Sequence, residues 1–87
     1  MVTMYSTQWC GYCHRLKSQL EREGIGHSIV DIEDDLAAAE YVMGVNGGNR
    51  TVPTVRFADG SALTNPTIGQ VKEHLTKINT TLQKSAY

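Results

Sequence analysis

The hydrophobic positions of this chain repeat with two different periods, and each change of period marks a new element. Val2 to Tyr5 is a short apolar run of β-forming residues, and His27 to Ile32 alternates between polar and apolar side chains, so both stretches predict strands. Between them, Gly11 to Glu23 carries Leu16 and Leu20 four residues apart among charged neighbours, which predicts an amphipathic helix. Two strands joined by a helix are expected to run parallel.

Glycine and acidic residues mark where the helices begin and end. Gly24 is expected to end the first helix. The acidic run Glu33 to Asp35 suits the positive end of a helix dipole, so a second helix is predicted from there to Met43. Gly44 and the run Asn46 to Asn49 then break the pattern and predict a loop.

The last third of the chain predicts a hairpin and a helix. Thr51 to Phe57 is predicted to be a third strand, and Ala58 to Ser61 a tight turn into a brief antiparallel fourth strand at Ala62 to Leu63. Asn65-Pro66 matches the N-cap and first residue of a last helix, which is expected to fray over residues 85–87. The apolar positions that recur at helical spacing in it are Ile68, Val71, Leu75, Ile78 and Leu82.

The order of these elements, β-α-β-α-β-β-α, resembles the thioredoxin and glutaredoxin fold, an α/β arrangement of a four-stranded mixed sheet flanked by three helices. Two cysteines lie at the first strand-to-helix junction, and Pro53 opens the third strand, as in that fold. We therefore expect residues 1–87 to form one glutaredoxin-like domain, with a cis peptide bond before Pro53.

Composition and charge narrow the class of protein. Hydrophobic residues make up 40% of the chain and charged residues 20%, which is typical of a globular protein. The formal net charge of -1 and the lack of a basic run argue against nucleic acid as a partner. Because no stretch is apolar enough for a membrane span and the N-terminal sequence lacks an export signal, we expect a cytoplasmic protein.

The two cysteines stand three residues apart in Cys10-Gly11-Tyr12-Cys13-His14, a spacing that fits three chemistries. A structural zinc ion needs four ligands, and the histidines of this chain form no His-x3–5-His pair, so we expect no metal. Covalent haem attachment fits Cys-x-x-Cys-His, but the predicted strands disagree with an all-helical c-type cytochrome. In a reducing compartment, thiol–disulfide exchange is favoured, with a non-catalytic metal-binding module as the alternative.

The spacing of the cysteines suits thiol–disulfide exchange because of helix geometry. If Cys10 caps the first helix, the unpaired N–H groups of the first turn point at its sulfur and favour the thiolate. Cys13 lies on the same helix face, where it can reach a mixed disulfide formed at Cys10. The Cys10 sulfur is expected to be the more exposed of the two. Gly11 would allow a substrate to approach closely.

Further candidate site residues flank the cysteines. Trp9 and Tyr12 would form flat apolar walls, with ordinary packing under the loop as the alternative. In a thioredoxin-like fold, the segment Thr51-Val52-Pro53 lies beside the cysteines and leaves the Val52 backbone free to pair with an extended thiol substrate. The forked donors of Arg50 suit an anionic or hydroxyl-rich substrate, although a solvated loop arginine is an equally simple interpretation.

Three stretches, in this order and at these spacings, resemble the mycoredoxins, glutaredoxin-like proteins of mycothiol-producing actinomycetes: TQWCGYCHRLK, VNGGNRTVPTVRFADGS and LTNP. The resemblance runs from Met4 to about Ile78 and implies a thiol–disulfide oxidoreductase. By this resemblance Cys10 would attack the mycothiol sulfur of a mycothiolated protein and hold mycothiol as a mixed disulfide, which a second mycothiol would release. Cys13 would be a secondary resolving thiol, able to form a Cys10–Cys13 disulfide.

The same resemblance implies the partners of the reaction. Mycothiol would be a co-substrate rather than a bound cofactor, with electrons supplied from NADPH through a mycothiol disulfide reductase. The clients would be mycothiolated proteins of the peroxiredoxin or arsenate reductase type, and the protein would act as a monomer. Val52 and Pro53 carry over as the backbone contact of the substrate and the cis-proline.

The chain departs from glutathione-using glutaredoxins after the fourth strand. Those proteins usually have a Gly-Gly pair there that helps to bind glutathione, whereas this chain has Leu63-Thr64-Asn65-Pro66. We therefore do not expect glutathione as the native thiol. The mycothiol that the resemblance implies would suit a polar rim of Arg50, Thr64 and Asn65 with its sugar. The alternative within redox proteins is a dithiol redoxin fed by thioredoxin reductase, which would donate electrons to an enzyme such as ribonucleotide reductase.

Overall fold

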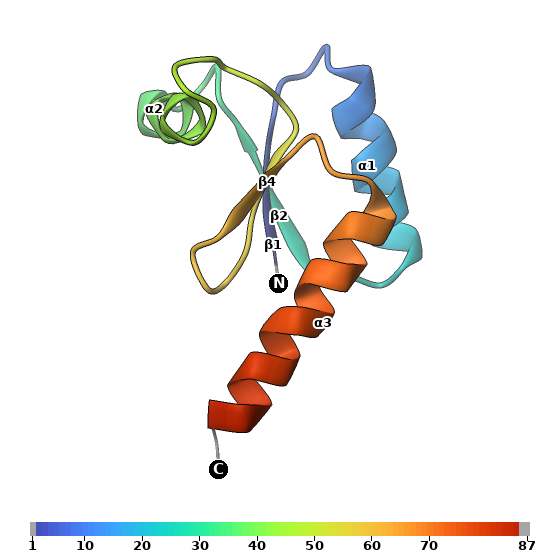
Figure 1. The fold of residues 1–87 in the computed structure, drawn as a ribbon. Coiled ribbons are helices and arrows are strands. Elements are labelled where there is room, and N and C mark those ends of the chain that lie inside the picture. The colour runs from blue at the N-terminus through green and yellow to red at the C-terminus, as the bar shows by residue number, and fades with distance from the viewer. Residues whose placement is uncertain (1, 86–87) are drawn as a thin grey trace.

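A computed structural model describes the backbone of residues 2–85 and the side chains of residues 2–78. Strands and helices follow one another in the predicted order (Figure 1). Their bounds are β1 (Val2–Ser6), α1 (Gly11–Arg22), β2 (His27–Asp31), α2 (Leu36–Val45), β3 (Thr54–Arg56), β4 (Ala62–Thr64) and α3 (Ile68–Ser85). None of the described helices is long and apolar enough to cross a membrane.

The four strands form one mixed sheet in the order β2-β1-β3-β4. β1 pairs in parallel with β2, with Met4 opposite Ile29, and antiparallel with β3, with Met4 opposite Val55. β3 and β4 are antiparallel, with Val55 opposite Leu63. The mixed sheet, the parallel first pair and the final hairpin are therefore confirmed.

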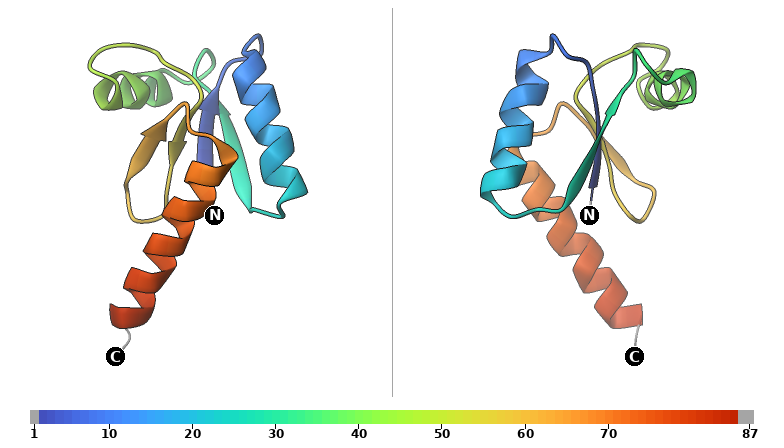
Figure 2. Two further views of the ribbon diagram at one scale, coloured as in Figure 1. Left: turned by 45° about the vertical axis from the view of Figure 1, so that its right-hand side comes forward. Right: turned by 180° about the vertical axis from the view of Figure 1, so that it is seen from behind.

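Helices cover both faces of the sheet, because side chains alternate along each strand. Met4 faces the side covered by α1 and α3, where it joins a buried cluster with Leu20 and Val71. Tyr5 faces the other side, where it packs with residues of α2 such as Val42. Figure 2 shows α2 on one side of the sheet and α1 with α3 on the other.

Several predicted boundaries of the middle elements differ from the structure, and the prediction that Gly44 ends the second helix is wrong because α2 continues to Val45. β3 begins at Thr54, so the prediction of a strand from Thr51 is wrong. Residues 51–53 form a loop because Pro53 has no N–H to donate, and its carbonyl accepts from the Asn65 backbone instead (2.7 Å). α2 begins at Leu36 with Asp35 as its N-cap, so the acidic run lies just before the helix rather than inside it.

The prediction that Asn65 caps the last helix is also wrong. Thr67 and Gln70 form a reciprocal capping box, in which each side chain accepts from the backbone N–H of the other (3.1 and 2.9 Å). Asn65 instead adopts a left-handed conformation with φ of 46° in the preceding loop. α3 includes Ser85, contrary to the predicted fraying there, whereas the predicted core position Leu82 and residues 86–87 lie outside the described side chains and backbone.

Candidate active site

The two cysteines lie where the chain passes from β1 into α1. Cys10 is the N-cap of α1, with extended backbone angles (φ −84°, ψ 108°). The backbone N–H of Cys13 has no partner within the first turn of the helix, and it donates to the Cys10 Sγ at 3.2 Å. Both cysteines are free thiols. The predicted capping arrangement is therefore present, with a backbone N–H donor against the Cys10 sulfur.

Cys13 sits in a different environment, one turn into the helix. Its side chain is 2% exposed, and burial is the main reason that its pKa is raised to about 12. Its hydrogen bond to the Cys10 sulfur and the charge of that sulfur raise the pKa further, while a hydrogen bond with the Thr7 backbone lowers it. The Cys13 thiol therefore keeps its proton through the neutral range.

Cys10 is less exposed than the sequence prediction suggested. Its exposed fraction is 6%, so the predicted order of exposure holds, but both cysteines are buried. The reason is the loop before β3, which lies against the helix N-terminus: the Cys10 thiol donates to the carbonyl oxygen of Val52 at 3.8 Å. The Val52–Pro53 peptide bond is cis, as predicted, with Pro53 buried and Val52 half-buried.

The aromatic residues that flank Cys10 project into solvent. Trp9 is 76% exposed and Tyr12 is 67% exposed, so the alternative that they pack under the loop is wrong. The Trp9 indole N–H donates to the carboxylate of Glu33, which follows β2 (2.6 Å). A Cβ built on Gly11 would meet no protein atom within 4 Å, so the space above this residue is open to an approaching substrate.

A groove of about 290 Å³ runs from the cysteine motif to the start of α3. We call it the α1–α3 groove. Tyr12 and Asn65 both line it, so the structure brings these two predicted residues together. The sequence analysis missed Arg15 and Gln19, although their spacing from Tyr12 (i, i+3, i+7) places all three on one helix face. The full lining is Tyr12, Arg15, Leu16, Gln19, Asn65, Pro66, Thr67 and Ile68.

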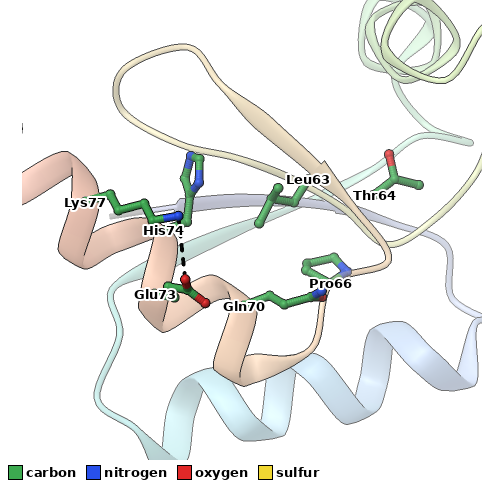
Figure 3. Close-up of a pocket in the computed structure, with 7 residues that line it drawn as sticks. All are labelled: Leu63, Thr64, Pro66, Gln70, Glu73, His74 and Lys77. Carbon is green, nitrogen blue, oxygen red and sulfur yellow. Dashed lines mark ion pairs between the residues drawn. The ribbon is translucent and has the colours of Figure 1, made fainter.

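The predicted polar rim is not assembled as one surface. Thr64 lines a second pocket, of about 240 Å³, between β4 and α3, where Glu73 and Lys77 form an ion pair of 3.5 Å (Figure 3). The Thr64 hydroxyl donates to the side-chain oxygen of Asn46. Arg50 is exposed in the loop before β3, next to the exposed Thr51, and lines neither pocket. Of the predicted rim, only Asn65 therefore faces the α1–α3 groove.

Within residues 2–78, no group of three or more His, Cys, Asp or Glu side chains could hold a metal ion. His14, which completes the Cys-x-x-Cys-His pattern, places its ring Nε2 2.7 Å from the carbonyl oxygen of Gln8. Among the described side chains, Cys10 and Cys13 therefore form a pair of free thiols with no third residue beside them that could complete a metal site.

A thiol pair at the N-terminus of a helix, beside a cis-proline loop on a four-stranded mixed sheet, defines a thioredoxin-fold thiol–disulfide oxidoreductase. The sequence profile of the Glutaredoxin family matches residues 2–62. The chain belongs to the glutaredoxin family.

Within this family, the chain is similar to proteins of actinobacteria. The chain is 61% identical over 77 residues to a glutaredoxin-type protein of Mycobacterium tuberculosis, covering 88% of this chain and 92% of the relative. It is 46% identical over 70 residues to Mycoredoxin 1 of Corynebacterium glutamicum, covering 80% and 86%. Among solved structures, the glutaredoxin of Archaeoglobus fulgidus superposes with a TM-score of 0.69 at 27% identity, covering 83% of this chain and 82% of that one.

Proposed function

We propose that this protein reduces mixed disulfides between mycothiol and proteins, using Cys10 as the nucleophile in a one-cysteine route. The observation that carries the proposal is the contrast between the two sulfurs. The Cys10 Sγ accepts the N–H of Cys13 at the start of α1, whereas burial raises the pKa of Cys13 to about 12. The Cys10 sulfur thus has a donor that can stabilise its thiolate for attack, whereas the Cys13 thiol stays protonated.

The reaction proceeds by two thiol–disulfide exchanges. The Cys10 thiolate attacks the mycothiol sulfur of the mixed disulfide, forms a Cys10–mycothiol disulfide and releases the client as a thiolate, which takes a proton from water. A second mycothiol thiolate then attacks the mycothiol sulfur bound to Cys10. This step forms mycothiol disulfide and returns the Cys10 thiolate, and NADPH reduces mycothiol disulfide through its reductase.

Cys13 acts as a secondary resolving thiol. After the first exchange it can attack Cys10, pass its proton to the departing mycothiol thiolate and form a Cys10–Cys13 disulfide. The charge on Cys10 and the hydrogen bond to it no longer hold back ionisation in that state, but the burial of Cys13 persists, and burial is the largest cause of its raised pKa. Burial of its thiol therefore disfavours ionisation of Cys13 in the internal route as well.

The sugar-bearing part of mycothiol binds in the α1–α3 groove. The Pro53 carbonyl accepts from the Asn65 backbone N–H at 2.7 Å. This hydrogen bond joins the loop beside Cys10 to Asn65, which lines the groove. The groove offers the ring of Tyr12 and the hydrogen-bonding groups of Arg15, Gln19 and Asn65. A flat ring beside several hydrogen-bonding groups suits a polyhydroxylated ligand. Similarity to Mycoredoxin 1 supports mycothiol as that ligand.

The 87 residues act as one monomeric glutaredoxin-like domain in the cytoplasm, where thiols are kept reduced. The clients are mycothiolated proteins of the peroxiredoxin or arsenate reductase type. These dock over the open space at Gly11 and against the exposed rings of Trp9 and Tyr12.

The test compares three reducing systems in parallel, each coupled to NADPH oxidation: mycothiol with its reductase, glutathione with its reductase, and thioredoxin reductase alone. The substrate of the first two assays is the same client protein carrying the matching mixed disulfide. We expect sustained turnover with mycothiol only. Equal turnover with glutathione would contradict the mycothiol assignment, and turnover with thioredoxin reductase alone would support the dithiol redoxin instead.

A further inference from the structure

We propose that Asn46, at the C-terminal end of α2, is a positioning residue that holds the Thr51–Thr54 segment, and with it the Val52 carbonyl, against Cys10. The inference rests on the proposed function, because it names a residue that sets the docking surface of that site. The sequence analysis placed Asn46 only in a loop. Its side chain instead joins three separate elements around the site.

The Asn46 side chain uses both of its polar atoms. Its Nδ2 donates to the carbonyl of Val42 in α2 at 2.8 Å and to the Thr54 hydroxyl in β3 at 3.1 Å. Its Oδ1 accepts from the Thr64 hydroxyl in β4. Asn46 therefore connects the end of a helix to two adjacent strands, and each contact is a side-chain hydrogen bond.

Thr54 links Asn46 to the loop of residues 51–53 through its hydroxyl. Thr54 is fully buried, and its hydroxyl accepts from Asn46 and donates to the carbonyl of Thr51 at 2.8 Å. On the other side of Val52, the Pro53 carbonyl accepts from the Asn65 backbone at 2.7 Å. Val52 is thus held from both sides.

The Val52 carbonyl, whose position these hydrogen bonds fix, is the group that contacts Cys10. The Val52 oxygen lies 3.8 Å from the Cys10 Sγ, which places the backbone of this residue beside the sulfur that a mixed disulfide would approach. The Cys10 thiolate, by contrast, is stabilised by the N–H of Cys13 within α1 itself. Asn46 is therefore expected to act mainly on where a substrate docks, because the N–H donor to the Cys10 sulfur lies within α1 and does not depend on the loop.

Two variants remove the restraint in different ways. In Asn46→Asp the carboxylate can still accept from Thr64 but cannot donate to Val42 or Thr54, and it draws the Thr54 hydroxyl away from Thr51. Thr54→Val keeps the shape of the side chain and removes the hydroxyl. The matched controls are Thr54→Ser, which keeps the hydroxyl, and Asn49→Ala. The second removes an exposed side chain that donates to the Asn46 backbone carbonyl at 3.4 Å, and it leaves the Asn46 side-chain hydrogen bonds in place.

Each variant is assayed for steady-state reduction of a mixed disulfide and for the rate at which iodoacetamide alkylates Cys10. We expect KM to rise about tenfold in Asn46→Asp and Thr54→Val, with kcat and the alkylation rate within about twofold of wild type. Thr54→Ser and Asn49→Ala should behave as wild type. Circular dichroism and the melting temperature confirm that each variant is folded at the assay temperature. If Asn46→Asp fails to fold, the KM of Thr54→Val alone tests the inference.

An unchanged KM in folded Thr54→Val would overturn the inference. So would a loss of activity accompanied by an equal loss of alkylation rate, because that pattern indicates general damage to the site. Failure of the proposed function gives a different result. If wild-type protein turns over glutathione mixed disulfides but not mycothiol ones, the mycothiol assignment is wrong, and the KM comparison is made with glutathione.

Discussion

The backbone N–H of Cys13 donates to the Sγ of Cys10 at 3.2 Å, so one residue supplies both the stabilising donor for the first sulfur and the second sulfur of the pair. The side chain of the donor residue is buried, which raises the pKa of its thiol, whereas its amide belongs to the first turn of α1 and donates to the Cys10 sulfur. This division explains how two thiols three residues apart can differ in reactivity. It also allows the two cysteines to be tested separately.

Alkylation should distinguish the two cysteines. Because the pKa of Cys13 is raised to about 12, its thiol stays protonated at neutral pH, and iodoacetamide should label Cys10 at pH 7.5 while leaving Cys13 unmodified. Labelling of Cys13 should increase only as the pH approaches 12. Peptide mass spectrometry of the reduced protein measures both sites, and the Cys10→Ser variant serves as the control. Similar labelling of both cysteines at pH 7.5 would show that burial does not hold back Cys13.

Arg15 should contribute to recognition of the sugar-bearing thiol. Arg15 lines the α1–α3 groove, so we expect Arg15→Ala to raise KM for a mycothiol mixed disulfide by about threefold to tenfold, a loss on the order of one net hydrogen bond. The matched control is Arg22→Ala, which removes an exposed arginine from the last turn of the same helix. Equal KM values for the two variants would argue against the groove as the sugar site.

Asp59 should make stability depend on pH. The Ser61 backbone N–H and hydroxyl donate to its carboxylate at 3.0 and 2.5 Å, and these bonds lower the pKa of Asp59 below its ordinary value. A carboxyl group whose pKa is lower in the folded state stabilises the fold at neutral pH, and this stability disappears as the pH falls through the folded pKa.

Asp59→Asn should therefore melt slightly below wild type at pH 7, and the difference should shrink as the pH falls below about 4. Thermal melts between pH 2.5 and pH 7 measure this trend. A difference in melting temperature that stays constant over this range would contradict the assignment.

Leu20 and Leu36 test which leucines hold the fold together. Leu20 is fully buried in the cluster between α1, α3 and the sheet, whereas Leu36 is 71% exposed. Leu20→Ala should lower the free energy of unfolding by about 3 kcal/mol, equivalent to roughly 10–20 °C in melting temperature. Leu36→Ala should change it by less than about 0.5 kcal/mol. Urea denaturation measures both, and a similar loss in the two variants would place the core elsewhere.

The fold was predictable because its signals are local and repeated. The spacing of Leu16 and Leu20 predicted α1, and Gly24, with φ of 68°, ends that helix as expected. The errors arose where two local signals competed. Asn65-Pro66 has the composition of a cap, but the Thr67–Gln70 pair two residues later makes the reciprocal hydrogen bonds.

The candidate site was predictable to the extent that it is continuous in sequence. The Cys10–Cys13 pair and the Thr51-Val52-Pro53 segment each form one short motif, and the structure places them together. The α1–α3 groove was missed because its walls, at Arg15 and Asn65, are 50 residues apart in the chain. Only the packing of α3 against α1 brings such residues together.

The most direct test of the account is the turnover of a mycothiolated client by Cys10→Ser and Cys13→Ser, measured with mycothiol, its reductase and NADPH, together with mass spectrometry of any adduct. We expect no turnover above background for Cys10→Ser. For Cys13→Ser we expect at least about a third of the wild-type rate and one mycothiol bound to Cys10. If Cys13→Ser is as inactive as Cys10→Ser, the one-cysteine route is wrong and both sulfurs are needed.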